Sequence, residues 1–192
     1  MKFIETLRGK AESFNSLNEE TTLISLILPF FIGLGYDVFD PKEFAAEYKL
    51  DLRNGGRDRV DLCYLKDGKA YMIIEAKKMD EKLDNHVGQL KRYYNTDVSI
   101  RYGVLTNGIE YWFFTDNIHK NIMSDEPFFK FNILESNDID LMYLEFFKKG
   151  RITVMQSEEK KKEVKGETKE SNQSEKGEKR YIYINSKQKK SF

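Results

Sequence analysis

Two stretches of this sequence decide its fold: Arg59-Val60-Asp61-Leu62 and, after one predicted hairpin, Ile73-Ile74-Glu75-Ala76-Lys77. Side chains alternate between the two faces of a strand, so Glu75 and Lys77 share one face of the second strand. Two carboxylates can hold a divalent metal ion and leave an ammonium group beside it. If Asp61 reaches the same face from the first strand, the pattern predicts a metal site on two adjacent strands.

The turn between these strands decides whether Asp61 reaches that face. A two-residue loop at Asp67-Gly68 would pair Asp61 with Ile74 and point it away from Glu75. A three-residue loop that begins one residue earlier would pair Asp61 with Ile73, diagonal to Glu75 at roughly 7–8 Å. The metal-site interpretation therefore requires a loop with an odd number of residues, or a bulge that restores the parity.

A second interpretation needs no metal. Charged and apolar residues often alternate on a half-exposed strand, and Asp61, Glu75 and Lys77 would then simply face water. The run from Ala70 to Ile74 is apolar enough for a strand buried on both faces. Charged side chains are costly in such a strand unless they are paired or bind a metal. The spacing alone leaves both alternatives open.

The composition suits one domain, because the chain has 192 residues, 40% of them hydrophobic, and no net charge. A neutral total excludes a strongly basic nucleic-acid binder, so any such binding surface must be local. The lone Cys63 cannot form an internal disulfide, and residues 1–5 lack the apolar stretch of a signal peptide. The apolar run Leu23–Leu34 is too short to span a membrane. We expect a cytoplasmic protein.

The expected elements follow from hydrophobic periodicity, capping residues and turn signals. They are a helix over 19–32 with a bend at Pro29, strands over 43–50, 59–65 and 70–77, a helix over 80–94, strands over 101–105 and 110–115 around Asn107-Gly108, a strand over 128–133 and a helix over 138–149. These elements form the domain expected over residues 1–156. Residues 157–192 are predicted to be a charged, disordered tail, although a basic tail could also touch nucleic acid.

Six motifs occur in the order found in the N-terminal nuclease domain of type I restriction enzyme R subunits, which this chain resembles over roughly residues 15–148. They are Asn18-Glu19-x-x-Thr22, Leu34-Gly35-Tyr36-Asp37-Val38, Arg59-Val60-Asp61, Ile74-Glu75-Ala76-Lys77, Gln89-Leu90-x-x-Tyr93 and Leu105-Thr106-Asn107-Gly108. The resemblance implies an α/β fold of the restriction-endonuclease-like PD-(D/E)xK type, with a mixed central β-sheet flanked by α-helices.

The resemblance also implies roles for individual residues. Asp61 and Glu75 match the family's magnesium ligands and Lys77 its catalytic lysine, while Val60 replaces the proline of the family's name. Gln89 and Tyr93 match the Gln-x-x-x-Tyr pair and share one helix face, from which they could reach the site or the DNA backbone. The other interpretation of that pair is a polar edge beside an apolar helix stripe.

An acidic residue of the first helix often joins the metal ligands in this family, and Glu19 matches it. Simple complementarity between a carboxylate and a helix N-terminus explains Glu19 nearly as well, and Glu20 is the neighbouring alternative.

The resulting hypothesis is a Mg2+-dependent endonuclease that hydrolyses DNA phosphodiester bonds, with Mn2+ as a possible substitute. DNA is the expected partner, together with other restriction-system subunits. Four basic residues could hold the DNA backbone or could simply be solvated: Lys78, Lys91, Arg92 and Arg101. The alternatives are a catalytically silent module that binds nucleic acid or a subunit, and a nuclease for RNA or branched DNA.

Overall fold

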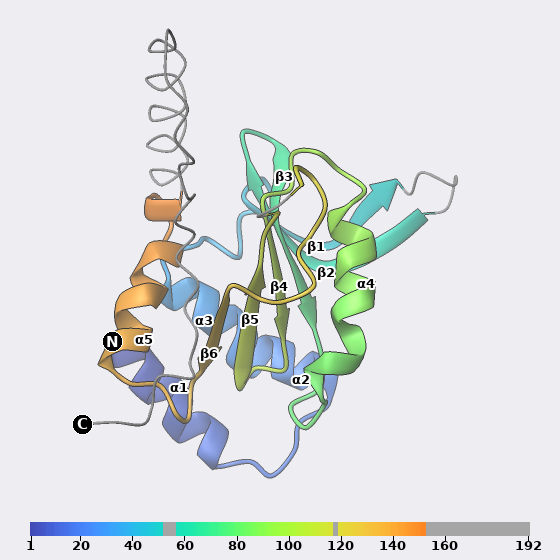
Figure 1. The fold of residues 1–192 in the computed structure, drawn as a ribbon. Coiled ribbons are helices and arrows are strands. Elements are labelled where there is room, and N and C mark those ends of the chain that lie inside the picture. The colour runs from blue at the N-terminus through green and yellow to red at the C-terminus, as the bar shows by residue number, and fades with distance from the viewer. Residues whose placement is uncertain (52–56, 117–118, 153–192) are drawn as a thin grey trace, which may run out of the picture.

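The computed structural model describes residues 1–51, 57–116 and 119–152. A single six-stranded sheet lies at its centre, and each strand is adjacent to its neighbours in sequence (Figure 1). The strands are β1 (Phe44–Asp51), β2 (Arg57–Lys66), β3 (Lys69–Ala76), β4 (Tyr102–Thr106), β5 (Glu110–Phe114) and β6 (Phe129–Asn132). Strands β3 and β4 pair in parallel and the other neighbouring pairs are antiparallel, so the predicted mixed sheet is confirmed. The tail expected over 157–192 lies outside the described residues.

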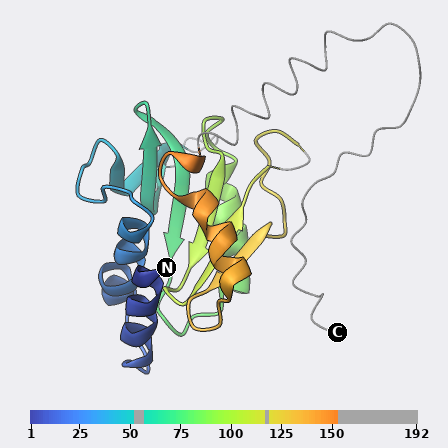
Figure 2. The ribbon, with the colours of Figure 1, turned by 90° about the vertical axis from the view of Figure 1, so that its left-hand side faces the viewer.

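Helices cover both faces of the sheet (Figures 1 and 2). One face is covered by α1 (Lys2–Glu12), by α2 (Glu19–Thr22), η1 (Leu23–Ile27) and α3 (Leu28–Gly33), and by α5 (Asp138–Leu144) with η3 (Glu145–Phe147). The other face packs against η2 (Leu83–His86) and α4 (Val87–Tyr94), which connect the parallel strands β3 and β4. Among the described helices, none has the length and apolar character needed to cross a bilayer.

The core has two layers because side chains of β3 alternate between the faces. Met72 and Ile74 pack toward α1 and α3, whereas Ile73 packs toward α4. On the first side the ring of Phe30 stacks on that of Tyr111, with 3.8 Å between centroids. Glu75 follows Ile73 at the alternate position, so the predicted charged residues belong to the α4 side of the sheet.

The helices differ from expectation in two places. No element was proposed for residues 2–12, and these residues form α1, whose buried stripe is only Ile4, Leu7 and Ala11. The helix expected over 80–94 begins at Leu83 as a 3-10 turn and becomes α-helical at Val87. The helix expected over 19–32 is present, with a π-helical turn over Leu23–Ile27 before Pro29.

The β2–β3 hairpin has a two-residue loop, so the three-residue loop considered from the sequence is wrong. Lys66 pairs with Lys69, and both loop residues have positive φ, 51° for Asp67 and 73° for Gly68. This conformation matches the right-handed twist of the flanking strands.

A bulge in β3 returns Asp61 to the same face of the sheet as Glu75, which the two-residue loop alone would not do. Leu65 pairs with Ala70, but Tyr64 pairs with Met72, so Tyr71 is the additional residue. Of the two devices that the metal-site interpretation allowed, the structure contains the bulge.

The β4–β5 hairpin brings the sheet against the N-terminal helices. Gly108 has a φ of 80°, and a Cβ atom on it would lie 2.8 Å from the Thr22 side chain and 3.1 Å from that of Leu26. The Asn107 side-chain oxygen accepts hydrogen bonds from the backbone N–H groups of Ile109 and Glu110, two and three residues later. The turn predicted at Asn107-Gly108 therefore also fixes the end of α2 beside the end of β4.

Candidate active site

Asp61 lies where β2 leaves its ladder with β3. The last pair of this ladder is Leu62 with Ile74, and the same register extended by one position sets Asp61 opposite Glu75. Asp61 Oδ2 accepts a 2.7 Å hydrogen bond from the backbone N–H of Ala76, in place of a strand partner. The pairing of Asp61 with Ile73 considered from the sequence is therefore wrong. Asp61 and Glu75 nevertheless lie on the same face of the sheet, as the metal-site interpretation required.

Glu75 is a buried carboxylate with one oxygen engaged and one free. Glu75 is only 2% exposed to solvent. Oε1 accepts hydrogen bonds from Lys77 Nζ at 2.7 Å and from Gln89 Nε2 at 2.6 Å. Oε2 is buried and has no hydrogen-bond partner among the described residues. Burial raises the pKa of Glu75 to about 7, and the nearby charge of Asp61 contributes.

Lys77 completes the group that the sequence predicted. Its backbone N–H donates to the Thr106 carbonyl at 2.8 Å, which anchors the end of β3 to β4. Burial favours the neutral amine, but the hydrogen bond to Glu75 and the charges of Glu75 and Asp61 outweigh it and raise the pKa of Lys77. The structure thus brings Asp61, Glu75 and Lys77 together.

Gln89 and Tyr93 come to the same place from α4. Gln89 Nε2 donates to Glu75 Oε1 and, at 3.1 Å, to the hydroxyl oxygen of Tyr93, which is one helical turn later. Tyr93 is buried beneath the helix. Of the two positions left open by the sequence, the site or the DNA backbone, the structure places Gln89 at the site. Their catalytic roles stay a prediction.

Glu19 lies near this group but is not part of it. It is exposed at the start of α2, where Asn18 caps the helix by accepting a hydrogen bond from the Thr21 N–H. Its charge contributes to the raised pKa values of Asp61 and Glu75. No direct contact to either carboxylate is found within the described residues, so its metal-binding role also stays a prediction.

The candidate site offers two carboxylates for Mg2+ but lacks a third ligand side chain of the usual kinds among the described residues. Nowhere in the ranges 1–51, 57–116 and 119–152 do three His, Cys, Asp or Glu residues form a group ready to hold a metal. Mg2+ nevertheless is often held by one or two carboxylates, with water and substrate phosphate as its other ligands. The unpartnered Glu75 Oε2 is the kind of atom that such an ion would satisfy, so Asp61 and Glu75 fit it.

One contact near the site was missed by the sequence analysis. Arg92 Nη2 donates to Asp58 Oδ2 at 2.7 Å, and the guanidinium carbon lies 5.1 Å from the centre of the Tyr93 ring. The helical spacing of Gln89, Arg92 and Tyr93 was a signal that these side chains share one face. The partner, Asp58 on β2, is 34 residues away and gave no such signal.

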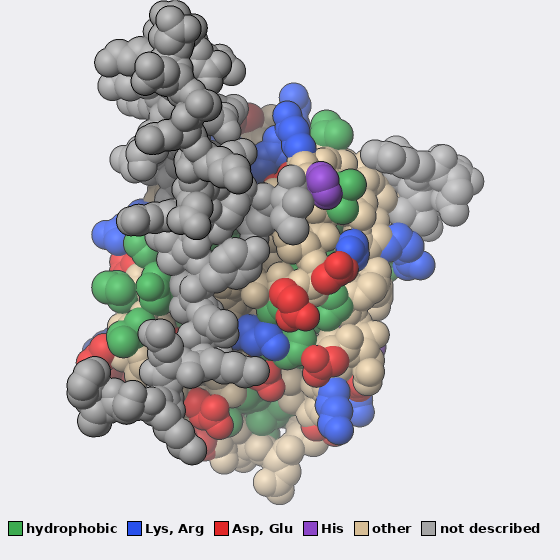
Figure 3. All heavy atoms as spheres, in the orientation of Figure 1, with side chains coloured by type: hydrophobic (Ala, Val, Ile, Leu, Met, Phe, Trp, Pro, Cys, Tyr) green, Lys and Arg blue, Asp and Glu red, His purple; other side chains and the backbone are tan. Residues whose placement is uncertain are grey.

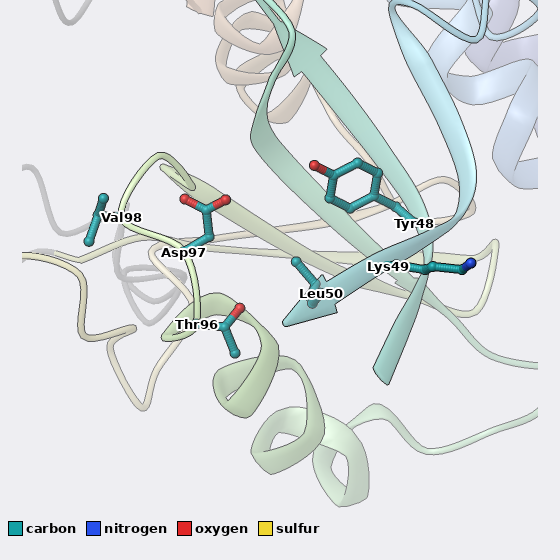
Figure 4. Close-up of a pocket in the computed structure, with 6 residues that line it drawn as sticks. All are labelled: Tyr48, Lys49, Leu50, Thr96, Asp97 and Val98. Carbon is teal, nitrogen blue, oxygen red and sulfur yellow. The ribbon is translucent and has the colours of Figure 1, made fainter. Parts of the chain in front are cut away.

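A surface pocket lies elsewhere, between the end of β1 and the loop after α4 (Figure 4). Its volume is about 310 Å3, and it is lined by Tyr48, Lys49, Leu50, Thr96, Asp97 and Val98. None of the predicted site residues lines it. Asp97 Oδ1 accepts hydrogen bonds from the Ser99 backbone N–H and hydroxyl, which hold this carboxylate in the loop.

Comparison with known proteins agrees with the motifs. Residues 34–127 match the family model of the type I restriction enzyme R protein N terminus. The resemblance is therefore confirmed over these residues, which include every predicted site residue except Glu19. A chain in the cryoEM structure of a DrdV-DNA complex shares the fold, with a TM-score of 0.54 over 77% of this chain and 12% sequence identity. The match spans only 14% of that longer chain. No curated protein matches.

Proposed function

We propose that this protein is a Mg2+-dependent endonuclease that hydrolyses phosphodiester bonds in DNA. The observation that carries the proposal is the buried Glu75 carboxylate beside Asp61. One of its oxygens is held by Lys77 and Gln89, and the other has no partner among the residues that the structure describes. The R-protein family match supports a restriction-related role, and the similarly folded chain comes from a DNA complex.

In this mechanism Asp61 and Glu75 would hold the metal. A divalent ion bound there would supply a more acidic water as nucleophile and would offset charge on the phosphate. Hydrogen bonds from Gln89 and Lys77 hold Glu75 Oε1, so Oε2 would be available to such an ion. Lys77 keeps its proton because of its carboxylate neighbours, and it orients the water and stabilises the charge that develops on the pentavalent phosphorus centre.

Cleavage of plasmid and linear DNA with Mg2+ or Mn2+ tests the proposal. We compare wild type with Glu75→Gln, which keeps the shape of the side chain, and with Lys77→Met. Each substitution should lower the rate roughly 100-fold or more. Glu135→Gln, an exposed acid in the loop after β6, is the control and should cleave normally. Circular dichroism confirms that each variant is folded.

Metal-independent cleavage, or full activity in Glu75→Gln, would contradict the proposed site. A folded wild type that binds DNA but cleaves no DNA substrate with either metal would instead favour the catalytically silent module. Cleavage of RNA or of branched DNA alone would correct the substrate class.

A further inference from the structure

Arg92 is held in a defined position at the edge of the candidate site. Its side chain is 57% exposed, yet its Nη2 makes a 2.7 Å ion pair with Asp58 and a 3.5 Å contact with the Tyr93 hydroxyl. The guanidinium also lies over the Tyr93 ring, an arrangement that favours a cation. An exposed arginine usually samples many rotamers, so these contacts restrict the direction in which it points.

Asp58 is itself well placed to hold Arg92. It lies on β2, three residues before Asp61, and its backbone pairs with Leu50 of β1. Leu50 and Val60 belong to the same core cluster as Leu90 and Tyr93 of α4. The β1–β2 ribbon therefore packs against α4, and the Asp58–Arg92 pair bridges the strand and the helix beside the site.

The other candidate phosphate contacts are engaged differently. Lys91 pairs with Asp125, Lys78 with Asp80 and Glu81, and the Arg101 guanidinium donates to nearby backbone carbonyls. Within the part of the chain that the structure describes, only Arg92 of these four belongs to a chain of contacts that leads, through Tyr93 and Gln89, to Glu75.

We propose that Arg92, held by Asp58 and the Tyr93 ring, binds a backbone phosphate of the DNA strand next to the phosphate that is cleaved. The bonds to Asp58 and to Tyr93 both come from Nη2. At Nε and Nη1 no acceptor is found within the described part of the chain, and each of these donors can make a charge-assisted hydrogen bond to a phosphate oxygen. The inference rests on the proposed function for its ligand class.

Fluorescence anisotropy of a labelled DNA duplex tests this subsite, with Ca2+ as the metal so that binding is measured separately from cleavage. Arg92→Ala should weaken binding several-fold and reduce the slope of log K against log salt by about 0.9, the value for one lost phosphate contact. Lys91→Ala removes the same charge from the same helix and should leave the slope unchanged. An unchanged slope in Arg92→Ala, or an equal reduction in Lys91→Ala, would overturn the inference.

The role of Asp58 as a positioning residue has its own test. Asp58→Ala should weaken DNA binding when Arg92 is present and have no effect in the Arg92→Ala background. If Asp58 merely repelled DNA, its removal would tighten binding, which would overturn this role. The inference and the proposed function fail separately: DNA binding that depends on Arg92 without cleavage supports the first only, and cleavage that is indifferent to Arg92→Ala supports the second only.

Discussion

Glu75 combines deep burial with an oxygen that has no partner in the described ranges of the chain, and that combination makes its charge unfavourable when no metal is bound. Burial and Asp61 raise its pKa from the model-compound value of 4.5 to about 7. Between these two values the folded protein holds a proton that the unfolded chain has lost. The free energy of unfolding contributed by Glu75 therefore falls as the pH rises from about 4.5 to 7.

Glu75→Gln should remove this loss. We expect the metal-free variant to gain stability relative to wild type between pH 5 and pH 8, by on the order of 2 kcal/mol. Urea unfolding at a series of pH values, with a chelator present, measures the difference. Glu135→Gln is the control because Glu135 is exposed and lies outside the predicted site, and it should show no such gain. A wild type and a Glu75→Gln variant with parallel pH profiles would show that Glu75 ionises without cost.

At the scale of elements, the sequence predicted the strands far better than the connections that set the site. Period-2 patterning located all six strands within one or two residues of their observed bounds, because buried strands of this sheet are strongly apolar. The bulge at Tyr71 has no local signature, since it is the packing of both faces that selects the register. The helix α1 gives a weak periodic signal, because only three buried residues stand among charged ones. The Asp58–Arg92 ion pair depends on how the β1–β2 ribbon packs against α4, and local sequence patterns do not reveal that packing.

The turn at Gly108 is the element-scale feature with the clearest mutational consequence. An alanine there must adopt a positive φ and place its Cβ against Thr22 and Leu26. We expect Gly108→Ala to lower the free energy of unfolding by about 2 kcal/mol, because strain and overpacking act together. Thermal or urea unfolding measures it.

Gly88 provides the matched control for that substitution. It lies near the start of α4, and a Cβ on it would meet nothing within 4 Å. Gly88→Ala should therefore stabilise the protein slightly, by about 0.5 kcal/mol, because alanine favours the helix. If both alanine variants behaved alike, the close approach of the β4–β5 turn to α2 and η1 would not be the constraint that we describe.

On the scale of the whole molecule, the net charge provides no long-range electrostatic attraction for DNA. The chain has no net charge, and basic residues exceed acidic ones in 157–192, so residues 1–156 are net acidic. On the face shown in Figure 3, acidic and basic side chains are interspersed instead of forming one basic surface. The candidate site adds two carboxylates that repel phosphate. DNA binding should therefore depend on the metal more than on the protein's own cations.

We expect the affinity of wild type for a DNA duplex to rise at least about 10-fold when Ca2+ replaces a chelator, because the ion offsets repulsion between phosphate and the Asp61 and Glu75 carboxylates. Anisotropy titrations at fixed ionic strength measure this change. In Glu75→Gln the dependence on Ca2+ should shrink, since the variant has less charge to offset and binds the ion more weakly. Equal affinity with and without metal, in both proteins, would place the DNA on a surface away from Asp61 and Glu75.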